Sequence, residues 1–238
     1  MKMRLTFLLL MGLFPGTFWG SKCLAHLKDS EIAAIVKNPT SPNISSGGNT
    51  ALRVVALEGG FVGRAAKHTP LNLASLKEAA KVAEGLSQRA QEHSAPVLRV
   101  IEAEGEVIAV SKKAPGKQLN TQPKANDIEA LSQIPQEHYD SLVATVRELR
   151  QKKIAVDSDP DNLFYDPKSG FCVIDLNSSS EVQVATDAVD VANYLTGQIE
   201  FITRPTDSSV FKLYEESFGW NRAHLETIAN KIHSALQK

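Results

Sequence analysis

The stretch VDSDPDNLFYD, residues 156–166, combines an acidic residue, a proline two positions before an asparagine, and the start of an apolar hairpin. A second acidic residue, Asp175, ends the apolar strand expected over 170–174. Carboxylate and amide oxygens are ligands that Mg²⁺ prefers, together with phosphate oxygens. The pattern predicts a metal and phosphate site, in which Asp157 accepts a proton from a hydroxyl while Asn162 and Asp175 hold Mg²⁺.

Two other interpretations apply to this acidic loop. Asp157, Asp159 and Asp161 alternate as in a calcium-binding loop, but Asn162 stands where that loop needs glycine and Lys168 where it needs glutamate. The calcium interpretation therefore fails at two positions. A solvated acidic turn between a helix and a hairpin remains as the structural alternative.

The chain before this loop predicts a small β-rich unit with one long helix. Residues 52–57 and 61–67 are apolar runs around Glu58-Gly59-Gly60, which is typical of a hairpin. A helix is expected from 72 to about 90, and a second strand pair over 97–102 and 107–110. A shorter helical stretch is expected near 30–37.

The chain after residue 113 predicts mostly helices. The polar stretch to Asn126 is interpreted as a connector between two lobes. A helix opening near Pro135 carries an apolar stripe at Tyr139, Leu142, Val143, Val146 and Leu149. Residues 185–238 indicate two or three further helices, with turns near Pro205 and Gly219, and Trp220 is expected to pack in this lobe.

On these motifs the chain resembles the protein-kinase-like superfamily, and within it the minimal secreted bacterial effector protein kinases. Residues 157–162 match the catalytic-loop pattern Asp-x-x-Pro-x-Asn, and Ile174–Asn177 stands where the metal-binding Asp-Phe-Gly is expected. Upstream, Ser45–Thr50 with Gly47 and Gly48 stands as the phosphate-covering turn. Ala65-Ala66-Lys67 matches the strand lysine, and Val110–Gly116 falls at the hinge that contacts adenine through its backbone.

The resemblance implies a function and a role for each residue. ATP and Mg²⁺ are the expected cofactors, and the γ-phosphoryl group goes to a hydroxyl of a protein substrate. Lys67 would hold the α- and β-phosphates, Glu78 would orient Lys67, and Asp157 would act as the catalytic base. Glu84 is the alternative partner for Lys67, and a capping box of Ser75 with Glu78 is the structural alternative for Glu78.

Three departures from the family pattern motivate a second function class. Ala155-Val156 replace the expected His-Arg, Asp159 replaces a phosphate-contacting lysine, and Asn177 replaces a glycine. An added carboxylate beside incoming phosphate opposes transfer unless a cation neutralises it. A catalytically inactive kinase-like module that binds nucleotide or protein is therefore one alternative. A small-molecule phosphotransferase and an unrelated secreted globular protein are the others.

The start of the chain predicts export. A basic beginning, a short apolar run broken by Pro15 and a small residue at Ala25 are typical of a signal peptide over 1–25. A membrane anchor and a buried N-terminal helix are the alternatives, although the apolar run is short for a span. Cleavage would remove Cys23 and leave Cys172 as the single cysteine. An exported phosphotransferase needs ATP, which either delivery into another cell, such as a host cell, or residence in a lumen supplied with ATP would provide.

Composition limits the possible partners and sets the expected fold class. The 238 residues are 42% hydrophobic and carry a formal net charge of -1, which argues against nucleic acid as a partner. No span is expected once the leader is removed. We expect an α+β, two-lobed, minimal protein-kinase-like fold over 26–238. A small β-rich N-lobe would occupy about 38–112 and a reduced helical C-lobe about 113–238.

Overall fold

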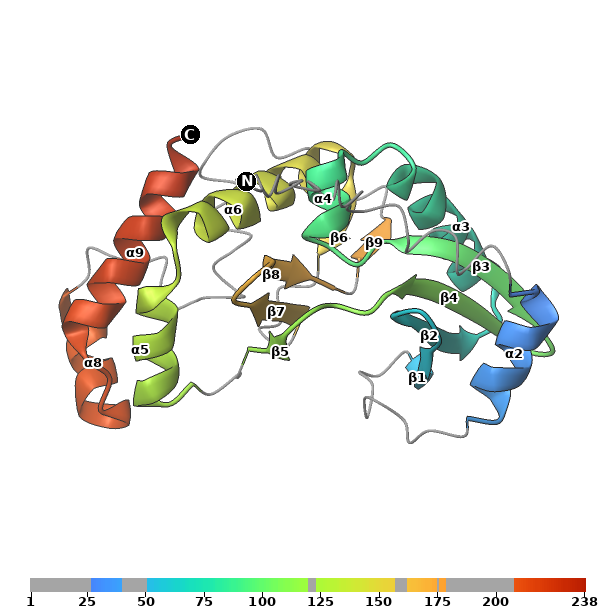
Figure 1. Cartoon of the computed structure of the whole chain (residues 1–238), viewed down its shortest axis with the longest axis horizontal. Helices are drawn as coiled ribbons and strands as arrows, with labels where there is room; N and C mark the ends of the chain where they lie inside the picture. Colours follow the sequence, from blue (N-terminus) through green and yellow to red (C-terminus); the bar gives the residue numbers. More distant parts are fainter. Residues whose placement is uncertain (1–26, 40–50, 120–122, 157–161, 175, 179–207) are drawn as a thin grey trace, which may run out of the picture.

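The computed structural model describes residues 27–39, 51–119, 123–156, 162–174, 176–178 and 208–238. The described elements form two lobes (Figure 1), with α2, α3 and β1–β4 in one and α5, α6, α8 and α9 in the other. The predicted α+β, two-lobed organisation is therefore confirmed. The predicted leader, residues 1–25, lies outside the described residues, and no described helix is long and apolar enough to cross a membrane.

The N-terminal lobe is built on one antiparallel sheet. Its strands are β1 (Ala51–Leu57), β2 (Phe61–Lys67), β3 (Val97–Ala103) and β4 (Glu106–Lys112), in the order β1-β2-β4-β3. Gly59, Gly60 and Gly105 have positive φ angles of 74°, 79° and 72°, which the tight turns of the two hairpins require. Both predicted hairpins are confirmed.

One face of this sheet is covered by α2 (Asp29–Lys37). Ile32 and Val36 of α2 are buried against Val55, Phe61 and other residues of that face. A Cβ atom on Gly63 would lie 2.6 Å from Cγ2 of Val36. Because glycine has no side chain, α2 can pack this close to the sheet at Gly63. The N-terminal lobe therefore extends to Asp29, ahead of the predicted start near residue 38.

The other face of the sheet is covered by α3 (Pro70–Ala83). Thr69 caps this helix, since its Oγ1 accepts a hydrogen bond from the Asn72 amide at 3.1 Å, and Pro70 occupies the first turn. Leu76 and Ala79 pack against Val97, Val107 and Ala109 of the sheet. Because Thr69 is the cap, Ser75 lies inside the helix and the alternative capping box with Glu78 is wrong.

The predicted long helix over 72–90 is in fact two helices. The first ends at the C-cap Glu84, and α4 (Gln88–Glu92) starts after a turn through Gly85 and Leu86. The apolar period continues to Leu86, but Leu86 is buried in the core of the other lobe and not against the sheet. Ser87 then caps α4 by accepting a hydrogen bond from the Ala90 amide at 3.2 Å.

The C-terminal lobe contains four described helices, α5 (Ala125–Gln133), α6 (Gln136–Gln151), α8 (Ser208–Phe218) and α9 (Arg222–Leu236). Buried residues of α5, α6 and α9 contribute to its core, and α8 contacts α9. The whole predicted stripe of α6 is buried. Trp220 is also buried, as predicted, and donates from Nε1 to the carbonyl of Pro123 at 2.9 Å. The helix α5 was not predicted, because the stretch to Asn126 was interpreted as a connector, and its buried Ile128 and Leu131 explain why it folds against α9.

Short strands lie between the two lobes. β5 (Lys117–Gln118), β7 (Leu163–Asp166) and β8 (Gly170–Val173) form one sheet, while β6 (Ile154–Val156) pairs with β9 (Leu176–Ser178). The segment after α4 docks on β8, because Val173 donates to the carbonyl of His93 at 3.0 Å and accepts from the Ala95 amide at 2.8 Å. These contacts fasten the N-terminal lobe to the C-terminal lobe.

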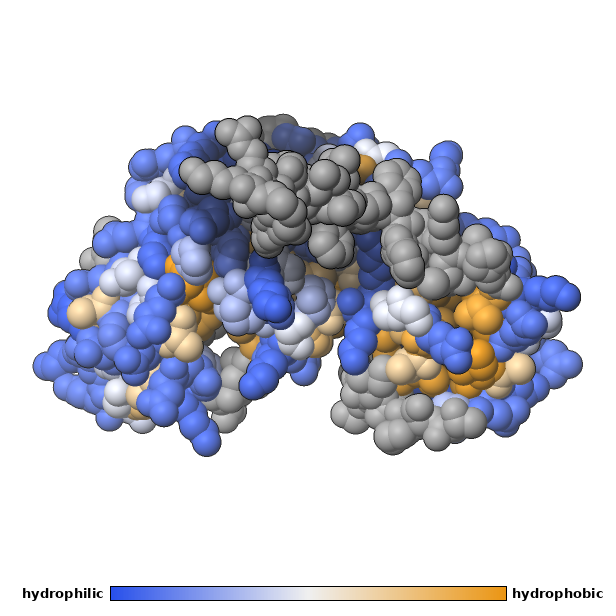
Figure 2. Space-filling view, viewed as in Figure 1, coloured by the Kyte–Doolittle hydropathy of each residue, from blue (hydrophilic) through white to orange (hydrophobic). Residues whose placement is uncertain are grey.

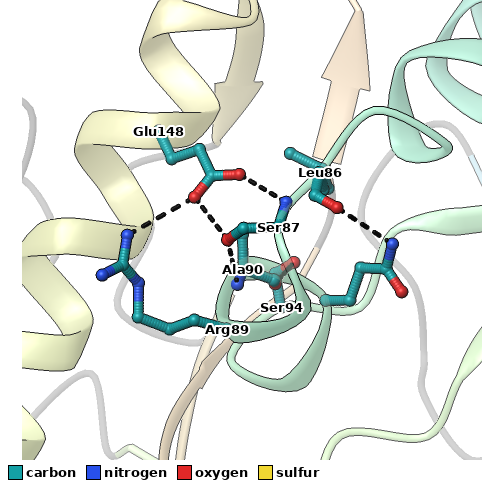
Figure 3. A network of polar contacts seen from close by, with 7 residues as sticks. Leu86, Ser87, Arg89, Ala90, Ser94 and Glu148 are labelled. Atoms are coloured by element: carbon teal, nitrogen blue, oxygen red, sulfur yellow. Dashed lines mark hydrogen bonds and ion pairs between the residues drawn. The ribbon is translucent and has the colours of Figure 1, made fainter.

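A second contact between the lobes involves Glu148 of α6. Its carboxylate accepts hydrogen bonds from the amide and the hydroxyl of Ser87, both at 2.6 Å, and pairs with Arg89 at 3.4 Å. Figure 3 shows these groups converging on the turn between α3 and α4. Burial raises the pKa of Glu148, but the hydrogen bonds and the Arg89 charge outweigh it and lower the pKa below its usual value.

Candidate functional site

Asn162 lies directly before β7, at the end of the hairpin that faces β6 and β9. The residue is only 9% exposed, and its carbonyl accepts a hydrogen bond from the Ile174 amide at 2.9 Å. No hydrogen bond of the Asn162 side chain is formed with the described residues. A nearly buried amide with no hydrogen-bond partner among the described residues fits a metal ligand, because amide oxygen is one of the ligands that Mg²⁺ accepts.

The pairing of β6 with β9 brings distant parts of the predicted site together. Val156 is the register partner of Leu176 across the two strands. Asp157 and Asp175 themselves lie outside the described residues, but Val156 precedes the first and Leu176 follows the second. Together with the bond between Asn162 and Ile174, this pairing joins the flanks of all three predicted positions.

Lys67 and Glu78 are not brought together. Lys67 is exposed at the end of β2 and pairs in register with Glu106, whose carboxylate forms an ion pair with Arg53 on the α2 side of the sheet. Ala65, two residues earlier, is buried in the α2 cluster, so strand alternation places Lys67 on the same face. Glu78 is exposed on α3, which covers the opposite face. The predicted pair is therefore not formed.

The alternative partner for Lys67, Glu84, lies elsewhere. It lines a cavity of about 760 Å³ between the turn after α3, α6 and α9. Charged groups around this cavity are paired within it, Glu148 with Arg89 and Asp140 with Lys238 at 2.5 Å. The cavity contains neither Asn162 nor Lys67 and is separate from the predicted site.

Arg64 is the cation of β2 that points to the α3 face. Its register partner Ala109 packs under α3, and Ala66, two residues on, belongs to the same cluster. The helix α3 also contacts β9, which begins immediately after position 175. Burial lowers the pKa of the Arg64 guanidinium, although arginine stays charged near neutral pH. Arg64 was not among the predicted site residues, although the alternation of buried positions over 61–67 places it on the face opposite to Lys67.

The hinge between the lobes is the connection from β4 to β5, residues 113–116. The Lys113 amide donates to the carbonyl of Gly60 at 2.8 Å, so this donor is occupied within the protein. Gly116 has a φ angle of 80°, and a Cβ atom there would lie 2.0 Å from the Tyr165 carbonyl oxygen. Figure 2 shows the surface hollowed between the two lobes on the side where β1, β2 and β5 lie.

Four of the predicted site residues lie outside the part of the chain that the structure describes. Gly47 and Gly48 lie outside the described residues, as do Asp157 and Asp175. Within the described ranges, no group of three His, Cys, Asp or Glu side chains is placed to hold a metal ion. The metal site predicted from the sequence therefore rests on Asn162 and on the two acidic positions flanked by paired strands.

Two solved structures of kinase-like domains are similar to this chain. The BubR1 kinase domain has 14% sequence identity and a TM-score of 0.39, over 54% of this chain and 43% of that chain. The pseudokinase domain of BIR2, an immune regulator of the RLK/Pelle family, has 14% identity and a TM-score of 0.49, over 93% of this chain and 85% of that chain. The chain thus spans less than half the length of the BubR1 chain. No family model and no curated protein matches the sequence.

The element order of the described residues is the one that the sequence resemblance implies. A hairpin, a helix and a strand pair precede the hinge, and helices with the β6 to β9 strands follow it. The described elements form a two-lobed α+β fold. A shared fold does not by itself carry an activity, which has to be argued from the site.

Proposed function

We propose that the chain is an ATP-dependent phosphotransferase of the secreted-effector protein kinase type. It would transfer the γ-phosphoryl group of Mg-ATP to a hydroxyl. The observation that carries the proposal is the convergence around Asn162. Its buried amide has no partner among the described residues, its carbonyl is bonded to Ile174, and Val156 is paired with Leu176. The described neighbours of the three predicted positions are therefore joined by backbone pairing at one end of the β7–β8 hairpin.

Each residue has a distinct role in this proposal. Asn162 and Asp175 would hold Mg²⁺, and Asp157 would orient the acceptor hydroxyl and take its proton. Arg64 replaces Lys67 as the cation directed to the phosphates, since it lies on the face of the sheet that α3 covers. Bound Mg-ATP supplies the phosphoryl group and the neutralising charge. The acceptor is proposed to be a protein hydroxyl, with a small-molecule acceptor as the alternative.

The second candidate is a kinase-like module that binds nucleotide or protein without transfer. The observation that favours it is the guanidinium of Arg64, since a planar fork with fixed donors is not equivalent to a compact lysine ammonium. The occupied amide of Lys113 also removes one hinge donor. Asp159 and Asn177 point in the same direction from the sequence.

Export is part of the proposal. We propose that residues 1–25 direct secretion and that the mature chain acts after delivery into a cell that contains ATP, where it meets a host protein. An N-terminal basic and apolar segment supports export, and the requirement for ATP supports delivery. Fusing residues 1–25 to a reporter enzyme and measuring its release tests this part, and a reporter retained in the cytoplasm contradicts it.

One experiment separates the two candidates. The purified chain is incubated with Mg²⁺ and γ-labelled ATP, with and without a mixture of host proteins, and label transfer is measured beside ATP-dependent thermal stabilisation. Transfer that is lost in Asp157→Asn supports the phosphotransferase. Stabilisation without transfer supports the binding module. Neither effect in the wild-type chain contradicts both.

A further inference from the structure

His93 and His138 are far apart in sequence but flank the same glycine. His93 is the C-cap of α4, and His138 lies in the first turn of α6. A Cβ atom built on Gly170 would lie 3.3 Å from Cδ2 of His138 and 3.5 Å from Cε1 of His93. Gly170 has a φ angle of 82°, so both its backbone and the two rings require glycine there. The two half-buried imidazoles therefore face one point at the start of β8.

Both rings use Nδ1 for a hydrogen bond within the protein. His93 Nδ1 lies 3.0 Å from the Phe171 carbonyl oxygen, which only accepts, so Nδ1 carries the proton and Nε2 keeps its lone pair in the neutral ring. His138 Nδ1 is bonded to the hydroxyl of Tyr165 at 3.2 Å. Neither Nε2 atom has a hydrogen-bond partner among the described residues. Orientation of Nδ1 by a second group is the arrangement that metal-binding histidines use.

We propose that His93 and His138 form a binding site for a divalent transition metal of the zinc class. Imidazole nitrogen suits zinc, copper or nickel, whereas Mg²⁺ prefers oxygen ligands. The two Nε2 atoms would bind the ion, and water would complete its coordination, because the described residues offer no third His, Cys, Asp or Glu ligand.

The location of the site means that a bound metal would affect the contact between the two lobes. The carbonyl of His93 accepts from the Val173 amide at 3.0 Å, so His93 stands where the N-terminal lobe is fastened to β8. His138 belongs to α6, the central helix of the other lobe. A bound ion would cross-link the segment after α4 to α6 and strengthen this joint between the lobes.

The site is distinct from the proposed phosphotransfer site. Gly170 pairs with Asp166 at the turn end of the β7–β8 hairpin, whereas Asn162 precedes the opposite end, where Leu163 pairs with Val173. The zinc proposal therefore stands or falls independently of ATP binding.

Thermal unfolding and calorimetric titration with ZnCl₂ test the proposal, with MgCl₂ as the comparison ion. We expect Zn²⁺ to raise the unfolding midpoint of the wild-type chain, and His93→Gln or His138→Gln to weaken Zn²⁺ binding at least about tenfold. His233→Gln, on the exposed face of α9, is the matched control and keeps wild-type binding.

Three results overturn the proposal. They are no Zn²⁺ binding by the wild-type chain, equal binding by both histidine variants and the wild type, or dependence on only one of the two histidines. If a variant does not fold in EDTA, the wild-type chain alone gives the answer. Zn²⁺ must then protect both His93 and His138 from diethyl pyrocarbonate, as mapped by mass spectrometry, and modification of either residue at an unchanged rate contradicts the site.

Discussion

Val156 of β6 and Leu176 of β9 are register partners, although the acidic loop and the whole β7–β8 hairpin separate them in the chain. This pairing closes the hairpin into a loop whose two ends meet. The hydrogen bond from the Ile174 amide to the Asn162 carbonyl joins the start and the end of the hairpin next to this strand pair. The described neighbours of positions 157, 162 and 175 are therefore joined by backbone hydrogen bonds.

The two cations of β2 should differ in their effect on nucleotide binding. Because Arg64 lies on the α3 face and Lys67 on the α2 face, Arg64→Met should weaken Mg-ATP binding about 10- to 100-fold. This range corresponds to about 1.5 to 3 kcal/mol for hydrogen bonds to a charged group. The matched control is Lys67→Met, on the opposite face of β2, and this variant should bind Mg-ATP as tightly as the wild type does. Titration calorimetry measures both, and the reverse order would restore the original assignment of Lys67.

Two glycines with similar backbone angles should tolerate alanine differently. Gly116 and Gly60 have φ angles of 80° and 79°, so alanine is strained at both, at a cost of about 1 to 2 kcal/mol. At Gly116 the new Cβ atom would also meet the Tyr165 carbonyl at 2.0 Å, whereas nothing lies within 4 Å at Gly60. Urea denaturation should therefore show a clearly larger loss of unfolding free energy for Gly116→Ala. Equal losses would mean that the hinge does not approach β7 in this way.

Cys172 should be unreactive in the folded protein. Burial raises the pKa of its thiol to about 12, with the charge of Lys112 opposing the shift, so the reactive thiolate is scarce at pH 8. In Cys23→Ser, where Cys172 is the single thiol, a disulfide reagent should react slowly in buffer and at the rate of a free thiol in 6 M urea. Rapid reaction in buffer would show that β8 is not buried in solution.

Glu148 should make stability depend on pH at the acidic side. Its pKa is lowered on folding, so the unfolded chain takes up the proton first, and the stabilisation is present above about pH 4.5 and lost as the pH falls further. At pH 7, Glu148→Gln should lower the unfolding free energy by about 1 to 3 kcal/mol. The difference from the wild type should shrink toward pH 3. Glu129→Gln, on an exposed face of α5, serves as the control, and a pH-independent difference for Glu148→Gln would contradict the role of its charge.

The strands and the central helix could be predicted because their signals are local. Alternating apolar residues around Glu58-Gly59-Gly60 define the first hairpin, and the stripe from Tyr139 to Leu149 defines α6. The end of α3 could not be predicted, since the apolar period runs on through Leu86 although Leu86 belongs to the core of the other lobe. That choice between two cores is made by tertiary packing.

The site could be predicted in part for the same reason. The spacing from Asp157 to Asn162 and Asp175 is carried by the sequence itself, and the paired flanks agree with it. The face on which a cation of β2 lies depends on which side α2 and α3 take, so the sequence alone did not show that Lys67 and Glu78 lie on opposite faces of the sheet. The spacing of the two histidines beside Gly170 matches no metal-binding motif in the sequence, because three separate elements of the fold bring them together.

Label transfer from γ-labelled ATP tests the central claim most directly, measured for the wild-type chain, for Asn162→Ala and for Lys67→Met as control. We predict Mg²⁺-dependent transfer to a protein in the wild type and in Lys67→Met, and its loss in Asn162→Ala, whose buried amide would hold the metal. Transfer that persists in Asn162→Ala at the wild-type rate, or its absence from the folded wild-type chain, would contradict the account.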